Sequence, residues 1–135
     1  MNINKDLVKT YLKVGFILSI VIILATIWGR KEDKYLKEHG IITVGKVINT
    51  FLVKGNSAII VEFEYKGKSY TNGTNLPNSD CSHCLMNDSL PVLFDTTFYY
   101  GGEVLECEKQ FRFYNKDPKP YLRFLENAQE CRCCD

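Results

Sequence analysis

The chain lacks a large excess of either charge. Its 135 residues include 17 Lys and Arg and 16 Asp and Glu, which leaves a formal net charge of +1. A nearly neutral chain has no global field that attracts nucleic acid, and the predicted strands show no basic face interleaved with aromatic residues. We therefore expect no nucleic-acid partner.

Histidine is also scarce, and no catalytic motif stands out. There are two histidines, His39 and His83, and neither is in a recognisable frame with a serine and a carboxylate. Gly101-Gly102 is too short for a phosphate-binding loop and precedes a predicted strand. Glu62 and Glu64 alternate along one strand, which is more typical of a solvated face than of acid–base catalysis. The sequence predicts no enzyme and no cofactor, and it identifies no small-molecule substrate.

Charge is missing altogether from the stretch Val14 to Gly29. As a helix this run would cover about 24 Å, close to the ~30 Å of a hydrocarbon core, and the flanking Lys13 and Arg30 can snorkel to the headgroups. Gly40 is a good helix terminator after a run of strong helix formers. We therefore predict one helix from near Lys5 to His39, anchored in a lipid bilayer through Tyr11, Val14, Phe16, Ile20, Leu24 and Trp28.

Two other interpretations of this run are weaker. A cleaved signal peptide would fit the lysines before the run, but no A-x-A-like site follows and Ile27-Trp28 is bulky where small residues are needed. A buried soluble helix would need a core that covers it on every side. The orientation in a membrane stays open, because positive charge flanks both ends: Lys5, Lys9 and Lys13 before the run, and Arg30, Lys31, Lys34 and Lys37 after it.

From Ile41 the pattern is that of β structure. Ile41 to Val53 is rich in β-branched residues, and a turn signal follows at residues 54–57. Ala58 to Lys66 alternates, which places Ile59, Val61, Phe63 and Tyr65 on one face and Glu62, Glu64 and Lys66 on the other. Lys66-Gly67 then turns the chain into Lys68 to Asn72. These signals predict a three-stranded antiparallel meander.

The remaining chain predicts short elements. We expect a long polar loop from Asn72 to Ser89, a strand from Leu90 to Asp95, short strands at Glu103–Cys107 and Gln110–Tyr114, and a helix from Pro120 to Ala128. Parallel βαβ units are excluded because no helical segment lies between the predicted strands. The fold class is mainly β with α: an N-terminal transmembrane helix, a small antiparallel β-barrel-like domain and a short C-terminal helix. The expected divisions are residues 1–40, 41–116 and 117–135.

Three segments resemble an uncharacterised bacterial family: Val44-Gly-Lys-Val47, Val61-Glu-Phe-Glu-Tyr-Lys-Gly-Lys-Ser-Tyr70 and Asn87-Asp-Ser-Leu-Pro-Val-Leu-Phe-Asp95. Members of that family carry one or two membrane helices and a small OB- or SH3-like β domain. The resemblance covers roughly Ile41 to Leu105, and its motifs are mostly turns and core positions. Asn87 and Thr96 depart from the family pattern, which has glycine and proline there. The resemblance implies a fold and a membrane anchor, and no activity.

Six cysteines are the most specific feature: Cys81, Cys84, Cys107, Cys131, Cys133 and Cys134. In a small domain outside the cytosol such a set favours disulfides, and we expect at least one bond from Cys81 or Cys84 to the tail cysteines Cys131, Cys133 or Cys134. Zinc is the alternative, with Cys81, Cys84, Cys131 and Cys133 as ligands. Thiol–disulfide catalysis at Cys81-Ser-His-Cys84 would need a helix start after a strand, whereas we expect this motif in a loop.

Together these observations predict a single-pass membrane protein whose β domain, most simply extracytoplasmic, acts by binding another membrane or envelope protein. Candidate contact regions are the loop from Asn72 to Ser89, the aromatic turn Phe98-Tyr99-Tyr100, and Phe111 to Tyr114, although such aromatics could equally close the core. The alternative is a thiol-redox or zinc-binding membrane protein that uses the two cysteine clusters.

Overall fold

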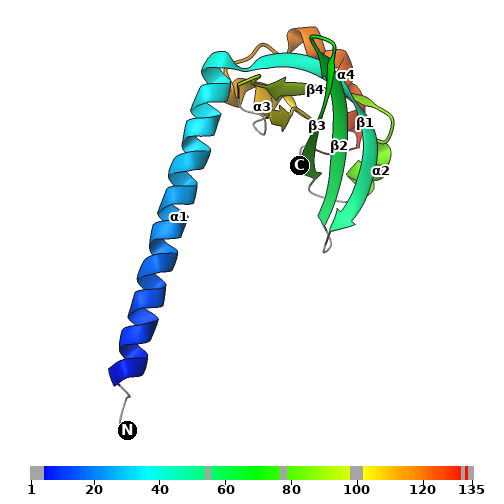
Figure 1. Ribbon diagram of the computed structural model, residues 1–135. Coiled ribbons are helices and arrows are strands. Elements are labelled where there is room, and N and C mark those ends of the chain that lie inside the picture. The colour runs from blue at the N-terminus through cyan, green and yellow to red at the C-terminus, as the bar shows by residue number, and fades with distance from the viewer. Residues whose placement is uncertain (1–4, 54–55, 77–78, 98–101, 132, 134–135) are drawn as a thin grey trace. The chain divides into compact units, whose positions relative to one another are not determined.

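The computed structural model describes residues 5–53, 56–76, 79–97, 102–131 and 133 (Figure 1). By its internal contacts the chain divides into two compact units, Met1–Lys34 and Tyr35–Asp135. The first unit contains most of one long helix. The second contains the last turn of that helix and the rest of the chain.

Helix α1, Lys5–His39, is continuous, as the sequence predicted. No proline interrupts it, and its ends suit the helix dipole, with Asp6 in the first turn and Lys37 and His39 in the last. Gly40 follows the last residue of the helix: its N–H makes a final helical bond of 2.9 Å to the Leu36 carbonyl, and a side chain at this position would collide with that oxygen. Among the described residues, α1 is the one helix long and apolar enough to cross a membrane. The predicted anchor side chains on it are all exposed: Tyr11, Val14, Phe16, Ile20, Leu24 and Trp28.

The second unit is built on a curled antiparallel sheet with the strand order β3-β2-β1-β4-β5. The strands are β1 Ile41–Val53, β2 Asn56–Tyr65, β3 Lys68–Leu76, β4 Ser89–Phe94 and β5 Gly102–Val104. The predicted meander is therefore confirmed as β1-β2-β3. The sheet curls until β3 and β5 come into contact without pairing, so the domain is a half-barrel.

Strand β2 has the predicted register. Ile59, Val61 and Phe63 are buried, whereas Glu62 and Glu64 are exposed on the other face. The turn to β3 places both central residues at positive φ, Lys66 at 50° and Gly67 at 74°. Such a two-residue turn has the twist that an antiparallel hairpin needs, and it sets the pairing of Tyr65 with Lys68.

Two predictions about local structure were wrong. The stretch Asn72–Ser89 is not a long loop, because β3 extends to Leu76 and helix α2 occupies Ser79–Cys84. Gln110–Tyr114 is not a strand: helix α3 spans Glu108–Phe113. The Gln110 side-chain oxygen accepts hydrogen bonds from the N–H groups of Glu106 and Cys107, at 2.6 and 3.1 Å, and this contact favours a helix start over a strand. The predicted strand Glu103–Cys107 is correspondingly shorter and ends at Val104.

The C-terminal helix was predicted correctly. A short 3₁₀ turn, η1 at Lys119–Tyr121, leads into helix α4 at Leu122–Glu130. Strand β4 contributes to two buried clusters, and for this reason its sequence is a continuous apolar run. One cluster joins the inner face of the sheet to α2 and the C-terminal end of α4, and includes Ile59, Val61, Leu85, Val92 and Ala128. The other contains Leu36, Leu93, Leu105, Phe111, Tyr114 and Leu125.

Candidate functional site

The cysteines form two disulfide bonds between α2 and the C-terminal tail. Cys81 bonds Cys133 with a Cα–Cα distance of 5.4 Å, and Cys84 bonds Cys131 with a Cα–Cα distance of 6.2 Å. Both are loop-to-tail bonds of the kind that the sequence predicted. Cys134, the fifth candidate, lies outside the described residues.

The two bonds lie in different surroundings. Cys81 and Cys133 are buried in the cluster under the sheet, whereas Cys84 is exposed and Cys131 is half-buried. The motif Cys81-Ser-His-Cys84 does lie on a helix that follows a strand, contrary to the expected loop, but its cysteines bond the tail and not each other. In this arrangement the bonds fasten α2 to the end of α4.

The four bonded cysteines are the same four that the zinc hypothesis names. Zinc binds thiolates, and a sulfur atom in a disulfide is not a thiolate. Within the described ranges, no group of three or more His, Cys, Asp or Glu side chains is arranged to hold a metal ion. Cys107, next to α3, is the free cysteine of the described chain and is half-buried.

The ionisation of Glu106 is clearly shifted. Burial, reinforced by the nearby Glu103 carboxylate, raises the pKa of Glu106 from 4.5 to about 8. Its side chain is only 5% exposed. It lies where β5 leads into α3.

The other polar candidates are surface groups. His39 stacks on Tyr35 with ring centroids 4.4 Å apart at the end of α1, and His83 is exposed on α2. The Glu62 carboxylate accepts a hydrogen bond of 3.0 Å from the Ser69 hydroxyl on the exposed face of the sheet. This geometry is that of a solvated strand face, as expected.

The aromatic contact candidates divide into core and surface residues. Phe111 and Tyr114 are buried in the second cluster and pack α3 against the domain. Phe113 is exposed, with the Lys37 ammonium 4.0 Å from its ring centroid. Phe98, Tyr99 and Tyr100 lie outside the described residues.

Several exposed apolar side chains of the β domain lie on the C-terminal half of β1. Pairing of β1 with β4 ends at Lys46 and Ser89, and one further bond joins the Val47 N–H to the Asp88 carbonyl at 2.8 Å. Beyond that point β1 pairs with β2 alone within the described part of the chain. We call Ile48–Leu52 the β1 edge. Its apolar side chains Ile48, Phe51 and Leu52 are 41%, 39% and 61% exposed.

Hydrogen-bond alternation shows which backbone groups of the β1 edge point outward. Residue pairs of antiparallel strands alternate between bonded and non-bonded. Tyr65 and Lys68 flank the two-residue turn and form a bonded pair, so every second residue of β2 counted from Tyr65 bonds β3. The residues between them bond β1 instead. Ile60 and Ala58 are two of these, and their β1 partners are Asn49 and Phe51. Thr50 and Leu52 of β1 therefore point away from β2. In agreement, the Thr50 N–H bonds the side chain of its neighbour Asn49 at 2.9 Å.

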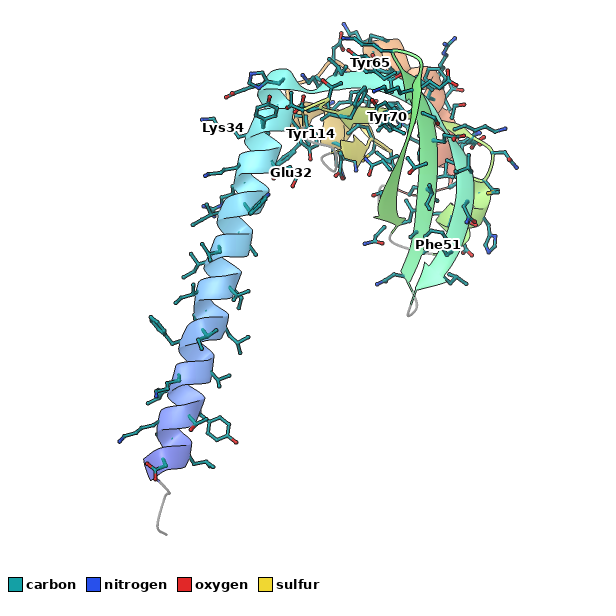
Figure 2. All side chains as sticks on the ribbon, viewed as in Figure 1. Glu32, Lys34, Phe51, Tyr65, Tyr70 and Tyr114 are labelled. Carbon is teal, nitrogen blue, oxygen red and sulfur yellow. A yellow bond between two sulfur atoms is a disulfide. The ribbon has the colours of Figure 1, made fainter. Side chains whose placement is uncertain are left out.

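A shallow groove adjoins the β1 edge on the outer face of the sheet. Phe51, Ala58 and Asn75 are cross-strand neighbours there, and Gly73 stands opposite Ile60 without a side chain to fill the space. The groove has a volume of about 310 Å³ and is lined by Phe51, Ala58, Ile59, Ile60, Thr71, Asn72, Gly73, Thr74 and Asn75. Figure 2 shows Phe51 near the C-terminal end of β1. Phe51 belongs to both the β1 edge and the groove, so the two adjoin each other.

The β1 edge was not among the predicted contact regions. The β-branched residues of Ile41–Val53 predicted the strand, but not which half of it a neighbour would cover. The signal available was length: β1 has 13 residues and β4 has 6. A long strand beside a short one leaves part of its edge without a partner.

No family model, curated protein or solved structure matches this chain. The resemblance to a bacterial family of membrane-anchored β domains therefore stays a prediction from the residues that carry it.

Proposed function

We propose that this protein is a membrane-anchored binding module whose β domain contacts another protein. The observation that carries the proposal is the β1 edge. It combines exposed apolar side chains with outward-pointing backbone groups at Thr50 and Leu52. An extended segment of a partner can add to such an edge as a further strand, with main-chain hydrogen bonds providing affinity and side-chain contacts providing specificity.

Helix α1 supports the membrane part of the proposal. Its apolar stretch is not buried by any other described segment, and the helix is long enough to span a bilayer. Lipid is the medium that removes such a surface from water. The module is thereby held at a membrane, where its partner is another membrane or envelope protein.

The two disulfides support an extracytoplasmic position for the β domain. Disulfides persist in oxidising compartments and are rare in the cytosol. The two bonds that join α2 to the C-terminal tail are compatible with folding in an oxidising compartment. The proposed orientation therefore places the N-terminal tail in the cytoplasm and the C-terminal domain outside it.

A photo-cross-linking amino acid at position 51, in the full chain in its native membrane, tests the binding proposal. The matched control carries the same amino acid at position 64, because Glu64 is exposed on the same face of the sheet but away from the β1 edge. We expect a protein adduct from position 51 and none from position 64. Failure of position 51 to capture any protein would overturn the proposal.

A second candidate is a thiol-redox or zinc-binding protein. The observation in its favour is the exposure of Cys84, which leaves the Cys84–Cys131 bond accessible to an attacking thiolate. Free-thiol counting and metal analysis of the purified chain distinguish this candidate from the binding module. Four oxidised cysteines and no bound zinc would support a structural role for the bonds. Free thiols with stoichiometric zinc would support the second candidate.

A further inference from the structure

We propose that the partner on the β1 edge is a second copy of this chain, paired antiparallel through the same edge. This inference rests on the proposed function, because it names the occupant of the same surface. A two-fold axis beside Phe51 would place Thr50 of each copy opposite Leu52 of the other. The two curled sheets would then join through their β1 strands.

The backbone groups of the β1 edge are self-complementary in this register. Thr50 and Leu52 are the residues whose N–H and C=O groups point away from β2. With the two-fold axis at Phe51, each outward-pointing residue meets an outward-pointing residue of the second copy, as a hydrogen-bonded antiparallel pair requires. The Thr50 N–H, now bonded to Asn49, would exchange this local bond for one to the second copy. Symmetry makes every such contact occur twice.

The outward-pointing groups favour this register over its neighbour. An axis at Thr50 would place Leu52 opposite Ile48, which lies at the bulge of β1, whereas the axis at Phe51 places Leu52 opposite the outward-pointing Thr50 on both sides of the axis. The Phe51 register therefore forms more of the available main-chain hydrogen bonds. Ile48–Leu52 contains no charged residue, so two copies of the edge bring no like charges together.

Side chains on the outer face add a contact to the strand pairing. Phe51 of one copy would lie directly opposite Phe51 of the other, and each groove beside Phe51 would continue into that of the second copy. The shared edge is only five residues long, so its affinity in solution is modest. Confinement of both copies to one membrane raises their effective concentration, so membrane attachment and pairing support each other.

Disulfide trapping of the full chain in membranes tests the inference. In the proposed register, Phe51 faces its own equivalent as a non-hydrogen-bonded pair, in which Cβ atoms are closest. Under mild oxidation Phe51→Cys should therefore give a species of twice the mass, with mass spectrometry identifying a bond between two copies of position 51. Glu64→Cys is the control, because its exposed side chain lies on the same sheet face. Equal trapping from both positions would indicate random collision and would overturn the inference.

A second variant tests the strand pairing itself. Because Leu52 points away from β2, Leu52→Pro removes an outward N–H without removing a bond to β2. We expect an unchanged near-UV circular dichroism spectrum and at least about a tenfold loss of Phe51→Cys trapping, since two hydrogen bonds are lost per dimer. Undiminished trapping in a folded Leu52→Pro chain would overturn the proposed pairing.

The two proposals fail differently. If Phe51→Cys is not trapped and the photo-cross-linker at position 51 captures a different protein, the second-copy inference is wrong and the binding-module proposal holds. If neither experiment captures a protein, both are wrong.

Discussion

The two disulfides are nested, and this arrangement predicts that their contributions to stability are not additive. The outer bond, Cys81–Cys133, spans 52 residues, and the inner bond, Cys84–Cys131, spans 47. Either bond alone closes nearly the same loop of the unfolded chain. Removal of one bond therefore leaves most of the constraint in place, whereas removal of both releases the whole loop.

Loop-closure entropy gives the magnitudes. Closing a loop of about 50 residues restricts the unfolded chain by about 4 kcal/mol, and once it is closed the second bond adds a ring of roughly seven residues, about 2 kcal/mol more. The exposed pair Cys84→Ala/Cys131→Ala should therefore cost about 2 kcal/mol. The buried pair Cys81→Ala/Cys133→Ala should cost more, because it also leaves a cavity in the core. Without packing losses, the fourfold variant should cost about 6 kcal/mol, which is more than the roughly 4 kcal/mol obtained by adding the separate costs of removing each bond alone.

Urea unfolding of the detergent-solubilised chain, followed by near-UV circular dichroism without reductant, measures these differences. The wild type, the two paired variants and the fourfold variant form a double-mutant cycle. The reasoning is refuted if removal of the exposed bond alone costs as much as about 4 kcal/mol. It is refuted equally if the fourfold variant costs no more than the two pairs together.

Three further predictions follow from the core, from Glu106 and from α1. Phe63→Ala should cost about 3–5 kcal/mol in a thermal melt, because Phe63 is buried against Phe94 and Tyr70, whereas Glu64→Ala should change stability by less than about 0.5 kcal/mol. Similar melts for both variants would contradict the register of β2. Because the pKa of Glu106 is about 8 in the folded chain and near 4.5 when exposed, the folded state binds the proton more tightly, and stability should fall as pH rises from about 5 to 8. Glu106→Gln should flatten this dependence, and an unchanged slope would show that another group causes it. The intact chain should stay in the membrane pellet after alkaline carbonate extraction, and release into the supernatant would exclude a spanning α1.

The elements that the sequence predicted well are those with a long, regular period. Helix α1 combines a continuous apolar run with a glycine stop, and β2 alternates over enough residues to define both faces. These signals arise within one segment. Such elements can therefore be predicted without knowledge of tertiary contacts.

The elements that the sequence missed depend on contacts between distant segments. Helix α3 has too few residues to show a helical period, and its start depends on the Gln110 side chain meeting the N–H groups of Glu106 and Cys107. Helix α2 is short and polar, and two bonds to the tail hold it in place. The sequence indicated loop-to-tail bonding, but the individual pairing depends on how α2 faces the end of α4.

The candidate site shows the same limit. The sequence pointed to aromatic residues, of which Phe111 and Tyr114 are core residues. The β1 edge exists because the pairing of β4 with β1 ends at Lys46. An uncovered strand edge is a property of two strands together, and no local pattern in either strand reports it.

Protease accessibility in intact spheroplasts of a bacterial host tests most directly the claim that the β domain is tethered to a membrane and lies outside the cytoplasm. The full chain is expressed, an impermeant protease is added, and the surviving peptides are identified by mass spectrometry. The account predicts digestion of the domain after His39 without lysis, with the Val14–Trp28 stretch protected in the membrane. Protection of the whole domain until detergent is added would contradict it.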